Sequence, residues 1–146
     1  MRRSLLRRKT KRTSPQPLLL ELIDGALDVM LEEYYTDYPN ETVGWILFSG
    51  AVLPLRNEAN RPDAFEISEI QVAETLVGHN ISPDDIFAIY HSHPTRKAEP
   101  STEDHKFMAE LHEVWPGKVH IILDHEGYRV WVYDEGVKEV SNVSAD

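Results

Sequence analysis

The sequence predicts a single α/β domain in which one curved, mixed β-sheet carries helices on both sides. Segments with the 3.6-residue period of amphipathic helices alternate along the chain with short runs of β-branched and aromatic residues typical of strands. The chain of 146 residues is long enough for one hydrophobic core and too short for two comfortable ones. Its hydrophobic content of 41% is ordinary for a globular domain, so a core of normal size is expected.

The chain begins with a basic segment that is expected to precede the folded domain. Residues 1–12 hold seven Lys and Arg residues and no acid, whereas the remainder holds 8 basic and 25 acidic residues, a formal charge of −17. We expect residues 1–16 to form a flexible arm, residues 17–140 the domain and residues 141–146 a frayed end. The arm is a candidate for contact with an anionic surface or nucleic acid, but the acidic body argues against nucleic-acid binding by the domain itself.

The first half of the domain is predicted to place a helix before a hairpin. Apolar residues recur every three or four positions after a Pro-containing linker, which predicts a helix packed on the core. Gly, Pro, Ser and Asn mark the breaks between elements. We expect a linker at Ser14–Pro17, a helix over 18–34, a loop over 34–40, strands over 44–48 and 51–55, a short strand over 64–67, and a helix from about Ser68 to a C-terminal cap at Gly78.

The second half is predicted to hold a buried strand, a helix and a hairpin. Trp45, Trp115 and Trp131 are interpreted as core residues. The chain has no apolar stretch of about 18 residues, so no membrane-spanning segment is expected, and a cytoplasmic location is predicted. The expected elements are a strand over 86–90, a helix that begins at Ser101, strands over 119–123 and 128–133, and a weak strand over 137–140.

The stretch Ala88–Asp104, AIYHSHPTRKAEPSTED, carries the residues with the clearest chemistry. Side chains alternate along a strand, so His91 and His93 project from the same face at the end of the predicted strand. Pro94 then ends that strand, because proline has no N–H for the ladder. The absence of cysteine excludes disulfides and thiolate ligands, so any bound metal must be held by His, Asp or Glu.

The carboxylate of Asp104 is predicted to point toward the core. In a helix capped by Ser101, Asp104 shares one face with apolar residues at helical spacing. A buried carboxylate needs a cation or strong hydrogen-bond donors, and the two histidines at the strand end offer a place for a cation. Ser101 and Asp104 could instead form a capping box alone, and His-Ser-His could be a surface pair. The combined spacing H-x-H-P, six residues, S-x-x-D favours the metal site.

These motifs resemble the JAMM (MPN-plus) metalloproteases, whose signature is an upstream glutamate followed by H-x-H, seven residues, S, two residues and D. The segment Pro39–Leu47, PNETVGWIL, resembles the upstream element, with Val43 where the family often has cysteine. The resemblance covers roughly residues 17–135 and is closest to the short prokaryotic and phage forms. It implies a three-layer, cytidine-deaminase-like domain with the metal at an edge of the sheet.

The resemblance also implies a mechanism and a set of site residues. His91, His93 and Asp104 would bind one Zn²⁺ per chain, with water as the fourth ligand. Glu41 would act as the general base, and Ser101 would donate a hydrogen bond to the oxyanion. The reaction expected is hydrolysis of an amide or isopeptide bond, with the C-terminal tail of a ubiquitin-like or sulfur-carrier protein as the leading substrate.

Three alternatives remain open at this point. The enzyme could be a phage tail-assembly or cell-wall peptidase of the same fold. The chain could be a metal-free MPN scaffold, although every motif position is filled. A 2-His-1-carboxylate Fe(II) oxygenase is a further chemical possibility, but such sites usually carry H-x-D with a distant histidine, which this sequence lacks.

Overall fold

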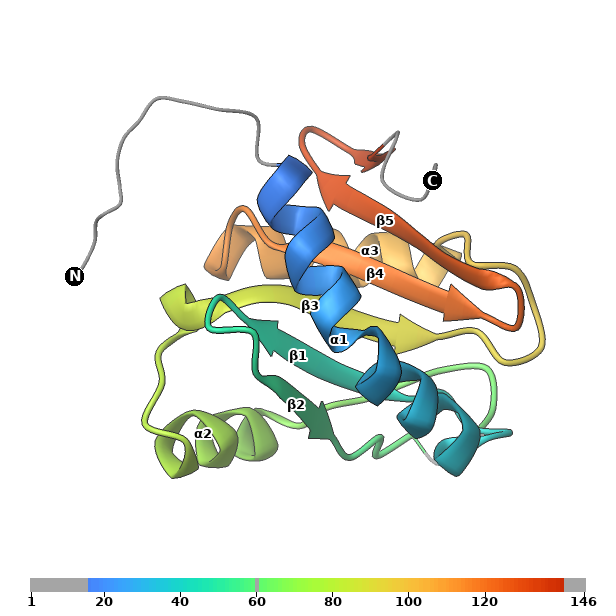
Figure 1. The fold of residues 1–146 in the computed structure, drawn as a ribbon, viewed down its shortest axis with the longest axis horizontal. Helices are drawn as coiled ribbons and strands as arrows, with labels where there is room; N and C mark the ends of the chain where they lie inside the picture. Colours follow the sequence, from blue (N-terminus) through green and yellow to red (C-terminus); the bar gives the residue numbers. More distant parts are fainter. Residues whose placement is uncertain (1–15, 60, 141–146) are drawn as a thin grey trace.

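The computed structural model describes residues 16–59 and 61–140, so residues 1–15 of the predicted basic arm and the predicted frayed end lie outside the described residues. One mixed sheet of six strands runs through the molecule in the order β2-β1-β3-β4-β5-β6. Helix α1 covers one face, and helices α2 and α3 cover the other (Figure 1). The predicted fold class, a mixed sheet with helices on both sides, is therefore confirmed.

The elements follow the predicted order with shifted boundaries. No described helix is both long and apolar enough to cross a membrane. The elements are α1 (Gln16–Asp37), β1 (Val43–Leu47), β2 (Val52–Leu55), α2 (Glu69–Gly78), a 3₁₀ turn (Pro83–Asp85), β3 (Ile86–Ser92), α3 (Thr102–Val114), β4 (Val119–Asp124), β5 (Gly127–Tyr133) and β6 (Val137–Glu139).

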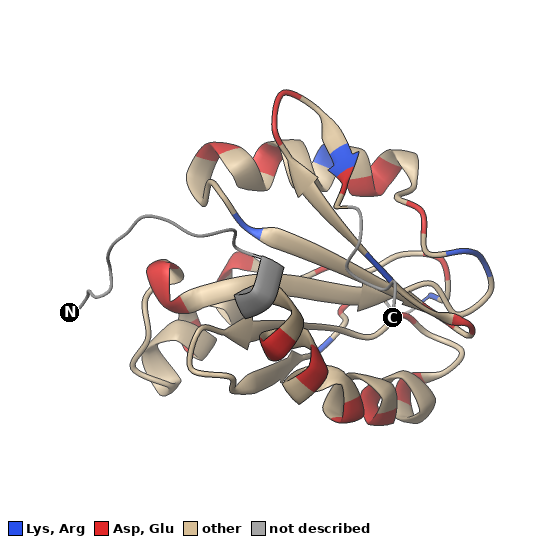
Figure 2. Cartoon of the chain, turned by 45° about the horizontal axis from the view of Figure 1, so that its top comes forward, with Lys and Arg blue, Asp and Glu red and all other residues tan. Residues whose placement is uncertain are grey.

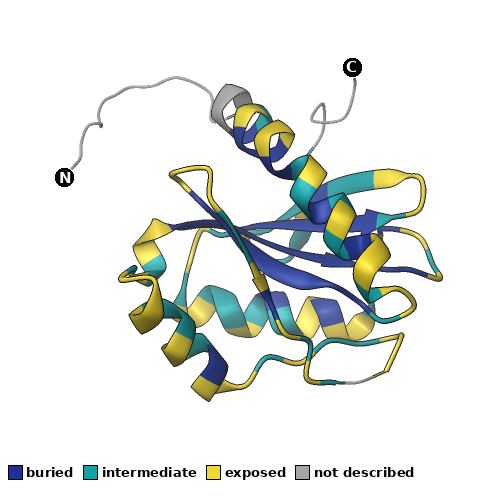
Figure 3. Cartoon of the chain, turned by 60° about the horizontal axis from the view of Figure 1, so that its bottom comes forward, coloured by how far each residue is buried: buried dark blue, intermediate teal, exposed yellow. Residues whose placement is uncertain are grey.

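Two cores lie on the two faces of the sheet. Residues of α1 at helical spacing, including Ile23, Ala26 and Met30, are fully buried against β1, β3, β4 and β5. On the opposite face, Trp45 of β1 and Ile89 of β3 meet the apolar residues of α2 and α3. Figure 3 shows the buried sheet between helices whose outer faces are exposed. A fully buried Ile or Met side chain contributes about 1.5–3 kcal/mol, so the layers depend on this burial.

Two predictions about helix boundaries are wrong. The linker was expected to include Gln16 and Pro17, but α1 begins at Gln16, and proline is tolerated in the first turn of a helix. Gly78 is the last residue of α2 and does not cap it; the left-handed residue is Asn80, with φ 54°. Asparagine adopts this conformation more readily than most residues because its short side chain can hydrogen-bond locally.

The predicted strand over 64–67 is absent, because a side chain replaces the neighbouring strand there. The Asn57 amide donates to the Ala64 carbonyl at 3.1 Å, and its oxygen accepts from the Glu66 N–H at 3.1 Å. Among the described residues of this loop, one backbone hydrogen bond crosses between its two sides, from the Glu58 N–H to the Glu66 carbonyl at 2.9 Å. The segment therefore forms an ordered loop held by one asparagine, without a ladder of its own.

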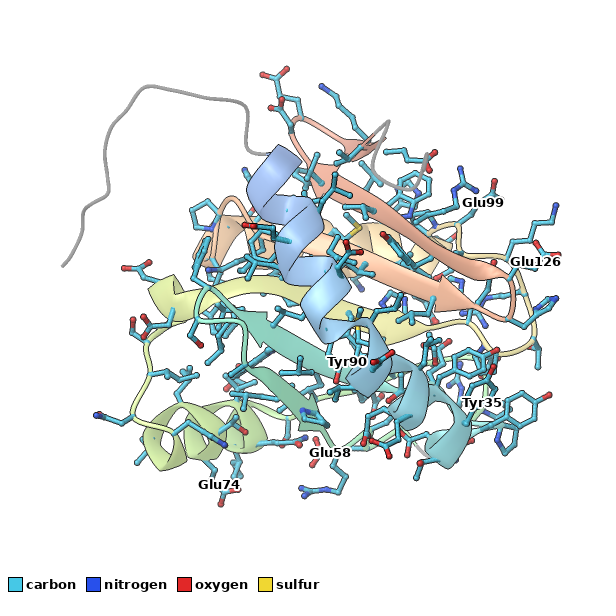
Figure 4. The ribbon with its side chains drawn as sticks, in the orientation of Figure 1. Tyr35, Glu58, Glu74, Tyr90, Glu99 and Glu126 are labelled. Atoms are coloured by element: carbon cyan, nitrogen blue, oxygen red, sulfur yellow. The ribbon has the colours of Figure 1, made fainter. Side chains whose placement is uncertain are left out.

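Gly44 gives a prediction about the centre of the sheet. Gly44 faces Tyr90 in the β1–β3 register, and a Cβ at position 44 would overlap the Tyr90 ring. Tyr90 is fully buried beneath α1, so its ring has little room to move (Figure 4). Gly44→Ala is expected to lower the free energy of unfolding by about 1–3 kcal/mol in urea denaturation, as overpacking does.

Gly25 provides the matched control for this substitution. It lies on the exposed side of α1, and a Cβ there would meet nothing within 4 Å. Gly25→Ala is expected to stabilise the protein by about 0.5–1 kcal/mol, because alanine suits a helix interior better than glycine. Equal unfolding free energies for Gly44→Ala and the wild type would contradict the packing described here.

Candidate metal centre

The site lies at the edge of the sheet where β3 and β4 end. These two strands are parallel neighbours, so their C-terminal ends reach the same edge, together with the turn from β4 to β5 (Figure 1). His91 is in β3, and the His93 N–H continues the pairing by donating to the Leu123 carbonyl at 2.7 Å. Both imidazoles leave the same face of the strand, as the alternation of side chains predicts.

The structure brings three predicted ligand atoms together. His91 Nε2 lies 3.3 Å from His93 Nε2, and each faces Asp104 Oδ2, at 3.3 Å and 3.0 Å respectively. All three side chains are buried. The group could therefore hold a metal ion, as the spacing in the sequence indicated.

A hydrogen bond sets the tautomer of His93. Its Nδ1 lies 2.7 Å from the Lys97 carbonyl, which can only accept, so Nδ1 carries the hydrogen. In the neutral ring, Nε2 then carries no hydrogen. Its lone pair faces the His91 Nε2 atom and the Asp104 carboxylate. A metal ion placed between these three atoms would accept electron density from all of them at once.

Asp104 reaches the site from the first turn of α3. Ser101 Oγ accepts from the Asp104 N–H at 3.0 Å, and Asp104 Oδ2 accepts from the Ser101 N–H at 2.9 Å, so the predicted capping box is present. The same Oδ2 also faces both imidazoles, so capping and cation binding are compatible. Burial raises the pKa of Asp104, but its close contacts with the His91 and His93 rings and the hydrogen bond from the Ser101 N–H outweigh it and hold the pKa well below its usual range.

The separations of the three ligand atoms are compatible with a tetrahedral metal ion. A tetrahedral Zn²⁺ with bonds of about 2.0–2.1 Å to nitrogen and oxygen keeps its ligand atoms about 3.3–3.4 Å apart. The three observed separations of 3.0–3.3 Å come close to that triangle. Two imidazoles and one carboxylate are also an established zinc ligand set that leaves one coordination position open. Phe65, whose ring lies 4.7 Å from the His91 ring, provides an apolar wall.

Glu41 lies beside this group but is not one of the three clustered ligands. It precedes β1, whose first residue, Val43, pairs with His91. Its side chain is 1% exposed, and Arg96 Nη2 donates to Oε2 at 2.8 Å. Burial raises the pKa of Glu41, while the nearby His91 and the hydrogen bond from Arg96 lower it. A carboxylate with a raised pKa next to a metal position has the properties of a general base.

The loop after β2 holds Glu41 in place. Besides its bonds to the loop itself, the Asn57 amide donates to the Glu41 carbonyl at 3.0 Å. On the other side, the Thr42 N–H donates to Ser92 Oγ at 2.8 Å, which ties the start of β1 to β3. The backbone of Glu41 is therefore fixed between the histidine strand and the loop that carries Phe65.

Ser101 lines a small cavity next to the ligand group. The cavity measures about 60 Å³ and is also bounded by Phe65, Asp104 and Phe107. The Ser101 oxygen accepts from the Asp104 N–H, and its hydroxyl hydrogen can still donate to a second group. The cavity has room for water, which needs about 10–15 Å³, or for a small group of a substrate.

Three residues at the site are not indicated by any pattern in the sequence. Arg96, Asn57 and Phe65 contact Glu41 or His91 across 55, 16 and 26 positions of sequence, and no local pattern indicates such contacts. His120 also lies near the site. It is buried on β4 next to the site, and burial lowers its pKa to about 3, so it stays neutral. His105, one residue after Asp104, is exposed.

The chain was compared with protein families, curated proteins and solved structures. The family model described as "Prokaryotic homologs of the JAB domain" matches residues 24–134. A solution structure of a Desulfitobacterium hafniense protein is similar in fold, with TM-score 0.58 and 20% identity over 78% of this chain and 84% of that one. A crystal structure of a JAB1/MPN domain protein from Archaeoglobus fulgidus has TM-score 0.44 and 20% identity over 80% of this chain and 91% of that one. No curated protein matches the sequence significantly.

Proposed function

Because the chain belongs to the prokaryotic homologs of the JAB domain, we propose that it is a zinc-dependent hydrolase of amide or isopeptide bonds. One observation carries the proposal: His91 Nε2, His93 Nε2 and Asp104 Oδ2 converge within 3.0–3.3 Å of one another. The buried Glu41 next to them supports the catalytic half of the proposal. A scaffold without metal would have no need to keep these buried polar groups together.

His91, His93 and Asp104 would hold the zinc ion. A zinc ion bound there supplies Lewis acidity, which acidifies water and polarises a carbonyl group. Glu41 takes a proton from the attacking water and delivers it to the leaving nitrogen as the C–N bond breaks. Arg96 holds the Glu41 carboxylate in one orientation and favours its ionised form, which is the form that can accept the proton.

Ser101 stabilises the negative charge that develops on the carbonyl oxygen. Ser101 lines the 60 Å³ cavity, so a hydroxyl directed there would donate to an oxygen placed in it. The narrow cavity also favours substrates without bulky side chains at the bond that is cut. We therefore propose the small-residue C-terminal tail of a ubiquitin-like or sulfur-carrier protein as the substrate.

The test is cleavage of designed fusion proteins. Fusions whose linking segment ends in Gly-Gly, Ala-Ala or Phe-Phe are incubated with the zinc-loaded protein, with and without a chelator, and read by intact mass. We expect one cut after Gly-Gly that the chelator abolishes and added zinc restores. Cleavage that persists in the chelator would contradict a metal hydrolase, and cleavage of all three fusions at equal rates would contradict the proposed substrate.

Ser101→Ala is expected to affect stability and catalysis separately. Loss of the cap lowers the free energy of unfolding by about 1 kcal/mol. Loss of the oxyanion donor lowers kcat by about 10²–10³-fold. Ser68 is the matched control, because its side chain caps α2 by accepting from the Gln71 N–H at 3.1 Å. If Ser68→Ala and Ser101→Ala reduced kcat equally, the oxyanion role would be wrong.

A further inference from the structure

One peptide group is hydrogen-bonded at both ends by side chains from different parts of the fold. The Lys97 carbonyl accepts from His93 Nδ1 at 2.7 Å, and the Ala98 N–H donates to Asp124 Oδ2 at 2.9 Å. These two groups belong to the same peptide unit, and in a trans peptide they point in opposite directions. Asp124 is therefore connected to His93 through a single planar group.

The surroundings of this peptide keep it in place. Ala98 is 1% exposed, and its carbonyl accepts from the indole Nε1 of Trp131 at 3.2 Å. Asp124 is the last residue of β4, and its other oxygen accepts from the backbone N–H groups of Glu126 and Gly127 at 2.8 Å and 3.0 Å. The carboxylate thus accepts three backbone hydrogen bonds and cannot turn away without losing them.

We propose that Asp124 is a positioning residue for the metal site. Its negative charge fixes and polarises the 97–98 peptide, which makes the Lys97 carbonyl a stronger acceptor for the His93 ring. That bond in turn fixes the tautomer and the orientation with which His93 Nε2 faces the metal position. In many metal sites a carboxylate contacts the ligand histidine directly and is worth about 10–100-fold in metal affinity. Here a peptide group stands between them. The inference rests only on the metal-binding half of the proposed function.

Asp124 could instead serve only to stabilise the turn after β4. The Asp124→Asn variant distinguishes this structural role from the proposed positioning of His93. The single amide oxygen of asparagine can accept from the Glu126 and Gly127 N–H groups and preserve the turn. Its NH₂ group then faces the Ala98 N–H, so only the contact to the peptide is lost. Asp124→Ser is a second variant, because its short hydroxyl can serve the turn but not reach Ala98.

Glu99→Gln is the matched control on the same loop. Glu99 pairs with Arg129 at 3.2 Å, and its side chain is 62% exposed. It lies at the same edge of the molecule as Glu126 in the turn after β4 (Figure 4). As a surface substitution it is expected to change zinc affinity by no more than about twofold.

The experiment measures zinc affinity by competition with a fluorescent chelator, and it follows the His93 Nδ1–H proton by NMR in the metal-free, ¹⁵N-histidine-labelled protein. Asp124→Asn and Asp124→Ser are expected to bind zinc about 10–100-fold more weakly. The His93 Nδ1–H signal should move upfield or broaden in both, but not in Glu99→Gln.

Wild-type zinc affinity and an unchanged His93 signal in a folded Asp124 variant would overturn the inference. If the wild type itself bound no zinc, the proposed function would fail. The NMR measurement would still decide whether Asp124 acts on His93, because it requires neither metal nor hydrolysis.

Discussion

Replacement of Glu41 by glutamine is expected to lower kcat/KM for the cleaved fusion by about 10²–10⁴-fold, the usual contribution of a general base. Glutamine has nearly the same shape and can still accept the hydrogen bond from Arg96, which reaches Glu41 at 2.8 Å. It cannot accept a proton at neutral pH. Zinc content, measured by elemental analysis, and thermal stability are expected to stay close to those of the wild type.

Glu66→Gln is the control for this substitution. Glu66 is exposed in the loop that carries Phe65, so the variant changes the charge near the site without touching the buried carboxylate. Acidic residues are spread over the helices and turns (Figure 2). An effect that came only from the loss of one negative charge would therefore appear in both variants. Full activity of Glu41→Gln, or equal losses in the two variants, would remove Glu41 from the mechanism.

His93→Ala is expected to abolish zinc binding at concentrations that saturate the wild type. The loss of zinc affinity should exceed about 100-fold, the upper end of what mutation of a hydrogen-bond partner of a metal ligand costs. Here the ligand itself is removed. Zinc that binds only the folded state raises stability, by about 2.7 kcal/mol at a concentration of 100 times Kd. The wild type should therefore gain thermal stability when zinc is added, and His93→Ala should not.

His105→Ala provides the control for loss of a nearby imidazole. His105 follows Asp104 directly in α3 but is exposed, and no described contact links it to the ligand group. Its zinc-dependent thermal shift should equal that of the wild type. A His93→Ala protein with an undiminished thermal shift in zinc would show that the ion binds elsewhere.

The sequence predicted the layers and the ligand group because both depend on short-range patterns. Residues at i and i+2, such as His91 and His93, lie on the same face of any strand. The face of α3 that carries Asp104 follows from helical periodicity. The buried strand over 86–90 and the α1 stripe around Ile23 and Met30 were likewise readable from period and composition.

The remaining features depend on contacts between distant parts of the chain. Asn57 replaces a strand for the segment near Ala64, so the β-like composition of that segment was misleading. Arg96 reaches Glu41 across 55 positions and Asp124 reaches Ala98 across 26, and each looks like an ordinary surface charge in the sequence. The assembled sheet, with β3 between β1 and β4, brings these side chains together.

X-ray diffraction at the zinc absorption edge, from crystals of protein supplied with one equivalent of Zn²⁺, tests the metal site most directly. We predict a single anomalous peak about 2.0–2.2 Å from His91 Nε2, His93 Nε2 and Asp104 Oδ2. A fully loaded crystal whose only peak lies away from these three atoms, or a protein that takes up no zinc, would contradict the assignment of this group as a metal centre.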